Sequence, residues 1–245
     1  MTVIEPSEGK AGTVPAPIAV ALDAPDLETA ARWATLVTPH VSTVKVGLEL
    51  YLRYGPEVVA SVRGASGVKI FLDLKLHDIP ATVAGATRAV ARTAPAYLTV
   101  HAAGGAQMVE AAVEAADETG PETKITAVTV LTSLSEPDLA AIGLAGPASE
   151  AARRLAGLSV EAGARAIVCS AHEVAAIRSE VGPEITLITP GVRPSGSDSQ
   201  DQARVATPEE ALKAGADLLV IGRPITRAAD PGAAAAAIAA ALRRS

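Results

Sequence analysis

Short apolar runs rich in β-branched residues recur along this chain, and a helical pattern follows each of them. Eight such runs can be placed, and their starts lie 20 to 41 residues apart. Strand-plus-helix units have this spacing, so eight of them predict an α/β fold, a (β/α)8 or TIM barrel with its active site at the C-terminal ends of the strands. The expected strands span residues 17–23, 42–47, 68–74, 97–101, 124–130, 165–169, 185–190 and 217–222.

The alternative fold is a doubly wound open sheet, which usually has roughly five to seven strands and a glycine-rich first turn. No Gly-x-Gly-x-x-Gly pattern follows the first expected strand. Asp26 is placed to cap the first helix, Pro80 suits the start of another, and Asp230 opens the last one. We therefore expect a single barrel domain over residues 15–245, preceded by a disordered tail over residues 1–14.

The composition limits the partners and compartments that we expect. The net charge is −6 and no basic stripe carries interleaved aromatic residues, so nucleic acid is not an expected partner. The single cysteine, Cys169, lies in an apolar run, which excludes an internal disulfide, fits a reducing cytoplasm and favours a buried core residue over a catalytic thiol. The Ala-rich C-terminal segment predicts a soluble helix rather than a membrane span, so no membrane partner is expected.

Charged side chains gather at the ends of the first three expected strands. Asp23 ends the first strand, and Lys45 lies in the second. The third strand supplies Asp73 and Lys75, which we expect on one side because a strand alternates sides, and Asp78 follows in the loop. Ions at a barrel rim can simply neutralise one another, because each offsets the burial cost of the next. Four inward-facing ions at the catalytic ends of these strands nevertheless predict an active site.

A second group of residues follows the seventh and eighth expected strands. Gly191 and Arg193 follow one strand, and Gly222 and Arg223 follow the other. These two loops often form a phosphate site in such barrels, because glycine lets backbone N–H groups approach an anion and arginine adds a bidentate charge. Turn glycines beside solvated arginines are the alternative explanation. The polar segment 191–206 is long for a loop in a compact domain and is interpreted as a lid.

Several short segments join these two groups into one longer pattern. They are Ala-Leu-Asp23, Val-Lys45-Val-Gly, Phe-Leu-Asp73-Leu-Lys75-Leu-His-Asp78-Ile-Pro, Thr-Val-His101-Ala, Leu-Thr132-Ser, Thr-Pro190-Gly-Val-Arg193-Pro, Asp-Gln202 and Ile-Gly222-Arg223-Pro-Ile. Over residues 17–227 the pattern resembles the orotidine 5′-monophosphate decarboxylases of the bacterial type. Asp-x-Lys-x-x-Asp is shared with a sugar-phosphate decarboxylase branch, but the following Ile-Pro and the Gly-Val-Arg-Pro loop favour the nucleotide enzymes. One departure is Ala81, a bystander position where many relatives have Asn.

The resemblance implies decarboxylation of orotidine 5′-monophosphate (OMP) to uridine 5′-monophosphate (UMP) and CO2, the last step of UMP biosynthesis, without a metal or an organic cofactor. It implies that Lys75 protonates C6 of the pyrimidine as CO2 leaves, and that Asp73 lies beside the substrate carboxylate. Lys45 would hold Asp73 and the ribose hydroxyls in place. Asp78 and Thr82 would reach into the neighbouring subunit's site, so that a homodimer is obligatory for activity.

The resemblance also implies a set of substrate-binding residues. Asp23 would bind the ribose, and Thr132, with Ser133 as a further candidate, would contact the pyrimidine ring. Gln202 would be delivered to the 5′-phosphate by the lid. The other residues implied around the ribose phosphate are Pro190, Arg193, Gly222 and Arg223.

Three alternatives stay open from the sequence. A Mg²⁺-dependent sugar-phosphate decarboxylase of the same barrel group would bind a divalent metal. An aldolase or isomerase would use Lys75 as a Schiff-base nucleophile, although the acids that flank Lys75 should keep it charged. A non-catalytic nucleotide-phosphate binder would need none of the Asp and Lys residues of the first three strands. His77, between Lys75 and Asp78, and His101, at the end of the fourth strand, are interpreted as structural residues.

Overall fold

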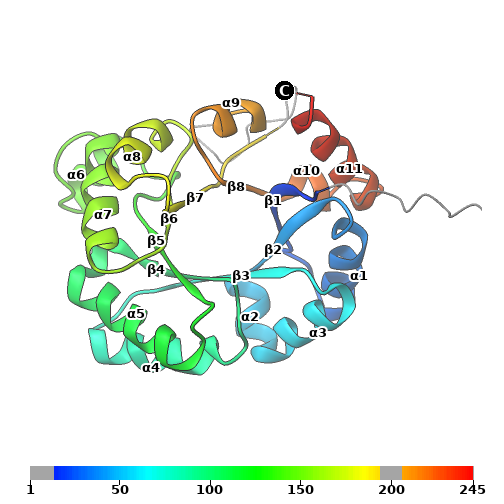
Figure 1. Cartoon of the computed structure of the whole chain (residues 1–245), viewed down its shortest axis with the longest axis horizontal. Coiled ribbons are helices and arrows are strands. Elements are labelled where there is room, and N and C mark those ends of the chain that lie inside the picture. The colour runs from blue at the N-terminus through cyan, green and yellow to red at the C-terminus, as the bar shows by residue number, and fades with distance from the viewer. Residues whose placement is uncertain (1–13, 194–205, 245) are drawn as a thin grey trace, which may run out of the picture.

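Eight parallel strands close into a barrel within residues 14–193 and 206–244, which are the residues that the computed structural model describes (Figure 1). The strands pair in chain order, and β1 also pairs with β8. The predicted (β/α)8 barrel is therefore confirmed, and the open doubly wound sheet is excluded. The strands are β1 (Ala16–Ala21), β2 (Val41–Gly47), β3 (Lys69–Leu76), β4 (Tyr97–His101), β5 (Lys124–Val128), β6 (Ala166–Val168), β7 (Thr186–Thr189) and β8 (Leu218–Ile221).

Helices form a ring around the outside of the barrel (Figure 1). Their predicted starts are confirmed: Asp26 accepts the N–H of Thr29 at 2.7 Å, Asp230 accepts that of Ala233 at 3.0 Å, and Pro80 begins α4. In the described part of the chain, no helix is long and apolar enough to cross a membrane. The helices are α1 (Leu27–Val37), α2 (Leu48–Tyr54), α3 (Pro56–Ser66), α4 (Pro80–Ala91), α5 (Ala106–Thr119), α6 (Glu136–Ala141), α7 (Ala148–Glu161), α8 (Val174–Val181), α9 (Pro208–Lys213), α10 (Arg223–Thr226) and α11 (Pro231–Leu242), with a 3₁₀ turn, η1 (Ala102–Gly104).

Apolar side chains form a floor beneath the barrel mouth. Phe71 of β3 packs edge-on against Tyr97 of β4, with ring centroids 5.9 Å apart. Because strand side chains alternate, Asp73 lies on the same face of β3 as Phe71 and one layer nearer the C-terminal end. The strand therefore carries an apolar layer first and a charged layer above it. The other buried members of the floor are Ala19, Ala166, Ile188 and Leu218.

Two predicted segments fall largely outside the described residues. The tail over residues 1–14 does so except for Val14, and the lid over residues 191–206 does so from residue 194 to residue 205. The domain boundary at residue 15 accordingly stays a prediction. The Ala-rich C-terminal segment is described, and it forms α11, which packs against α1.

Arg178 of α8 ties that helix to the segments before β7 and β8. Its guanidinium donates to the carbonyls of Gly182, Ile185 and Gly215 and pairs with Asp217. We expect Arg178→Ala to lower the free energy of unfolding by about 3 kcal/mol, because several partly buried acceptors lose a charged donor together. Urea unfolding followed by circular dichroism measures the loss.

The control for this prediction is Arg153→Ala on α7. Arg153 forms exposed ion pairs with Glu150 and Glu180. Exposed pairs are screened by water, so this variant should lose less than about 1 kcal/mol. Equal losses in the two variants would contradict the structural role assigned to Arg178.

Candidate active site

Four charged side chains form a continuous series at the C-terminal ends of β1, β2 and β3. Oδ1 of Asp23, which follows β1, lies 3.7 Å from Nζ of Lys45 on β2. The same Nζ lies 3.4 Å from Oδ2 of Asp73 on β3. Oδ1 of Asp73 in turn accepts a hydrogen bond from Nζ of Lys75 at 2.7 Å. The structure thus brings together, in alternating charge, the four strand-end ions that the sequence singles out.

The two central members of this series are the most buried. The side chains of Lys45 and Asp73 are each 12% exposed, against 31% for Lys75 and 67% for Asp23. Burial raises the pKa of Asp73, but the charges of Lys45 and Lys75, with hydrogen bonds from Lys75 and Thr99, outweigh it and hold that pKa below its usual value. Asp73 is therefore ionised at neutral pH, with a positive charge on each side.

The backbone of β3 is irregular at the site. Lys75 has a φ of +49°, in the left-handed region that costs a residue with a side chain roughly 1–2 kcal/mol. The expectation of a regular strand is therefore wrong at this residue, although Lys75 still meets Asp73. The N–H of Lys75 donates to Oγ1 of Thr99 on β4 at 2.8 Å. Thr99 is a site residue that sequence reasoning missed, because a threonine inside a strand is an ordinary feature.

A cavity of about 200 Å³ opens beside the charged series. Lys45, Asp73 and Lys75 line one side of it, and Thr132 adds a hydroxyl. The remaining surface is mostly apolar, so the cavity suits a small ring with its reactive atom facing the ions. The other lining residues are Phe71, Val128, Val130, Leu131, Val168, Cys169, Pro190 and Val220.

A second cavity, of about 490 Å³, shares Lys45, Pro190 and Val220 with the first. One ligand can therefore extend across both. Arg193 and Arg223, the two arginines that the sequence assigns to an anion, both line the second cavity. The arrangement offers a mostly apolar ring site at one end and a cationic site at the other.

Glycines shape the second cavity, and two further side chains line it. Gly191 has a φ of +75°, a conformation that favours glycine, and a Cβ on Gly222 would lie 3.3 Å from that of Ala21. Trp33 and Arg227 also line the cavity, and sequence reasoning missed both. Arg227 could have been predicted, because it lies one helical turn after Arg223. The sequence around Trp33 on α1 contains no comparable signal.

Some of the implied residues lie away from these cavities. Asp78 and Thr82, in the loop before α4 and in its first turn, are exposed and line neither cavity. Ser133 is also exposed and absent from both linings, whereas Thr132 lines the first. Gln202 lies outside the described residues. A single chain therefore does not bring Asp78 or Thr82 to the charged series.

Two histidines and the cysteine lie close to the site. The rings of His77 and His101 have centroids 5.4 Å apart, and their planes are tilted by 38°. Burial, together with the neighbouring His77 and Lys75, lowers the pKa of His101, so that its imidazole is neutral at pH 7. Cys169 is buried as predicted and forms part of the apolar wall, where burial raises the pKa of its thiol. The structural interpretation of the two histidines stays a prediction.

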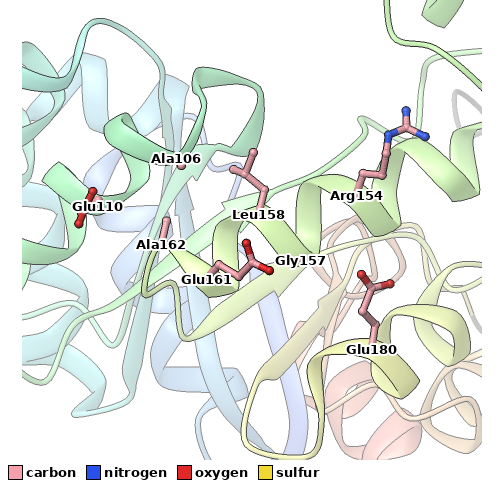
Figure 2. A pocket seen from close by; sticks show the side chains of 8 residues that line it. All are labelled: Ala106, Glu110, Arg154, Gly157, Leu158, Glu161, Ala162 and Glu180. Carbon is pink, nitrogen blue, oxygen red and sulfur yellow. The ribbon is translucent and has the colours of Figure 1, made fainter.

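A third cavity, of about 520 Å³, lies away from the barrel mouth, among the outer helices (Figure 2). Its lining comes from α5, α7 and α8 and includes Glu110, Glu161, Glu180 and Arg154. No strand end contributes to that lining, so the mouth of the barrel is the better candidate. Within residues 14–193 and 206–244, no three His, Cys, Asp or Glu side chains are grouped so that they could hold a metal ion.

Comparisons with known proteins give consistent matches over nearly the whole chain. The model of the family described as "Orotidine 5′-phosphate decarboxylase / HUMPS family" matches residues 16–238. A curated relative from Thermobifida fusca, named Orotidine 5′-phosphate decarboxylase, is 74% identical over 230 residues, which are 94% of this chain and 97% of the relative. A relative of the same name from Frankia casuarinae is 57% identical over 244 residues, covering 93% of this chain and 88% of the relative.

Solved structures give the same picture. The crystal structure of Orotidine 5′-phosphate decarboxylase from Lactobacillus acidophilus is similar with a TM-score of 0.81 at 35% identity, covering 93% of this chain and 99% of that one. An uncharacterized conserved protein from Geobacillus kaustophilus gives a TM-score of 0.80 at 37% identity, covering 92% and 100%. Both cavities of the barrel mouth lie within the region that the family model matches.

Replacing Lys45 by Met should raise the pKa of Asp73, because one of the two ammonium groups that offset its burial is removed. In the folded chain this pKa lies below the unfolded value of about 3.9, so ionised Asp73 contributes stability above about pH 4 that is lost as pH falls through the folded-state pKa. The variant should lose part of this contribution and unfold at a higher pH on acidification. A ¹³C NMR titration of labelled aspartate carboxyls measures the pKa directly.

The matched control is Lys69→Met, at the exposed start of β3. Lys69 takes part in none of the ion pairs of the charged series, so the titration of Asp73 should not change. An identical pKa for Asp73 in Lys45→Met and in the unsubstituted protein would contradict the charge balance described for the site.

Proposed function

The chain belongs to the orotidine 5′-phosphate decarboxylase / HUMPS family, and we propose that it is a carboxy-lyase that converts OMP to UMP and CO2, in UMP biosynthesis. One observation carries the proposal: an alternating Asp–Lys–Asp–Lys series borders a mostly apolar cavity that continues into an arginine-lined one. Binding a phosphate requires none of these four ions. A non-catalytic nucleotide-phosphate binder therefore leaves the charged series unexplained.

The chemistry requires charge stabilisation at C6 of the pyrimidine. When the bond from C6 to the carboxylate breaks, CO2 departs and the electron pair stays on C6. No carbonyl group adjacent to C6 can delocalise that pair, so its stabilisation has to be electrostatic. The Lys75 ammonium lines the cavity 2.7 Å from Asp73, where it can stabilise the pair and then donate a proton to C6. The neutral amine of Lys75 then regains a proton from solvent. Thr132, which also lines this cavity, contacts the pyrimidine ring.

Asp73 has two tasks in the proposed reaction. It holds the Lys75 ammonium in place, and its own negative charge lies beside the substrate carboxylate, which raises the free energy of the bound substrate. The lowered pKa of Asp73 supports both tasks, because its carboxylate is then negatively charged at neutral pH. Lys45 neutralises Asp73 from the other side and, with Asp23, contacts the ribose hydroxyls.

The arginine-lined cavity would hold the 5′-phosphate. Arg193 and Arg223 supply positive charge there, and Gly222 allows a close approach of the backbone. Gln202, from the predicted lid, would add an amide donor. Binding energy gained at the phosphate, remote from C6, is then available to close the lid and keep water from the reacting carbon.

A homodimer with shared active sites is a further part of the proposal. Asp78 and Thr82 are exposed, and we assign them to the site of a neighbouring subunit. Leu48, Leu52 and Ile79 expose apolar side chains on the segments that follow β2 and β3. Large apolar side chains that are exposed on these segments support packing against another chain.

We also propose that the reaction needs neither a metal nor an organic cofactor. Asp23 and Asp73 each lie within 3.7 Å of a lysine ammonium, which opposes the binding of a divalent cation between them. A Mg²⁺-dependent sugar-phosphate decarboxylase is the alternative to exclude by experiment. The acidic net charge and the single, buried cysteine support a cytoplasmic enzyme without a nucleic-acid partner.

The purified protein should convert OMP to UMP in excess chelator, because the proposed chemistry uses only protein side chains. Loss of the orotate absorbance band, with UMP and CO2 identified as products, measures the reaction. Turnover only of a sugar phosphate, and only with added Mg²⁺, would place the protein in the sugar-phosphate branch. Tight binding of UMP without any turnover of OMP would leave a nucleotide-phosphate binder.

Mixed dimers test the shared site. Lys75→Ala and Asp78→Ala homodimers should each lose nearly all activity, because every site then lacks either the proton donor or the neighbouring carboxylate. A heterodimer of the two variants has one site with both residues intact, so it should show about half the activity of the unsubstituted dimer. Inactive heterodimers, with their assembly shown by native mass spectrometry, would remove Asp78 from the neighbouring site.

A further inference from the structure

The hydroxyl of Thr99 on β4 bonds to both residues of the Asp73–Lys75 pair. Its oxygen accepts the backbone N–H of Lys75 at 2.8 Å and donates its proton to Oδ1 of Asp73, 3.1 Å away. Thr99 is fully buried, so bulk water does not compete for either bond. We propose that Thr99 is a positioning residue that fixes the Lys75 ammonium against the Asp73 carboxylate, an inference that rests on the proposed decarboxylation.

The pairing of β3 with β4 explains why a side-chain hydroxyl of β4 accepts the backbone N–H of Lys75. Leu72 pairs with Leu98, and the next pair is Leu76 with Val100. Residues 73–75 of β3 therefore lie opposite a single residue of β4, which is Thr99. Such a bulge interrupts the backbone ladder and re-aims the side chains of the bulged strand. The N–H of Lys75 donates to the hydroxyl of Thr99 at this break.

The conformation of Lys75 also needs outside support. Lys75 and Ala94 are the two non-glycine residues with positive φ in the described part of the chain. A left-handed residue with a side chain persists only where its surroundings hold it, and such residues concentrate at functional sites. The bond from the Lys75 N–H to Thr99 acts on the strained residue itself. It therefore controls the direction in which the lysine side chain leaves the backbone.

The three groups form a closed ring of hydrogen bonds. The Lys75 N–H points at the Thr99 oxygen, the Thr99 proton points at Oδ1 of Asp73, and the same Oδ1 accepts Nζ of Lys75 at 2.7 Å. A hydroxyl has one proton to donate, and its use toward Asp73 leaves the oxygen lone pairs for the N–H. Lys75 is thus held by both its backbone and its ammonium. Removing the hydroxyl opens the ring at two bonds.

Conservative variants of Thr99 separate this role from a general structural one. Thr99→Val removes the hydroxyl at similar volume, and a small displacement of a reacting group can cost about 100-fold in rate. We expect kcat to fall about 10- to 100-fold, while KM changes less than about threefold because the phosphate cavity is untouched. Thr99→Ser keeps the hydroxyl and should stay within about threefold of the unsubstituted kcat. Thr99→Ala carries the same expectation as Thr99→Val if the latter does not fold.

The matched control is Thr126→Val on β5. Thr126 pairs directly with Thr99 across the two strands and is equally buried, but its hydroxyl donates to the carbonyl of Lys124 instead of to the site. This variant should leave kcat unchanged. As a second readout, Thr99→Val should raise the pKa of Asp73 in a ¹³C NMR titration, because the carboxylate loses one donor.

The outcomes distinguish this inference from the proposed function. Unchanged kcat in Thr99→Val, an equal loss in Thr99→Ser, or the same loss in Thr126→Val would each overturn the positioning role. Absence of OMP turnover in the unsubstituted protein would refute the proposed function itself. A kcat loss in Thr99→Val that Thr99→Ser restores, together with the raised pKa of Asp73, supports the inference.

Discussion

The burial of the Asp73 carboxylate is the constraint on which the rest of the site depends. A carboxylate whose side chain is only 12% exposed is unstable unless positive charges and hydrogen-bond donors surround it. The chain supplies Lys45 from β2, Lys75 from β3 and the hydroxyl of Thr99 from β4. Three adjacent strands must therefore end at one place. A closed parallel barrel meets this requirement, because its strands all point the same way and their helices lie outside.

In the proposed function, the two cavities at the barrel mouth separate substrate binding from the bond-breaking step. The smaller one places the ions of β2 and β3 opposite apolar walls, where solvent screens charge less and each ion acts more strongly. The larger one carries Arg193 and Arg223, whose charges suit an anion that takes no part in bond breaking. Lys45 and Pro190 line both cavities, so in the proposed function a ligand anchored by its phosphate would have its ring beside Lys75. In this arrangement, one set of residues would bind the phosphate and another would contact the reacting carbon.

The sequence predicted those parts of the site that depend on local pattern. The spacing of apolar runs gave the eight strands, and consecutive strands are neighbours in such a barrel, so Asp23 and Asp73 could be expected on either side of Lys45. The left-handed Lys75 and the contacts of Thr99 could not be predicted, because they depend on the register between β3 and β4. No local sequence pattern indicates the register between these two strands.

The proposed reaction depends on the relative position of Asp73 and Lys75 as well as on their charges. The net charge of the site does not change when neutral CO2 leaves; the negative charge only moves, from the substrate carboxylate to C6. An acid beside the first position and an ammonium beside the second therefore act in the same direction, one on the ground state and one on the transition state. Asp73 and Lys75 exert these two effects only while each keeps a fixed position beside the substrate, which a flexible lysine side chain would not ensure. A strained backbone at Lys75, held by a buried hydroxyl, provides the rigidity that this arrangement requires.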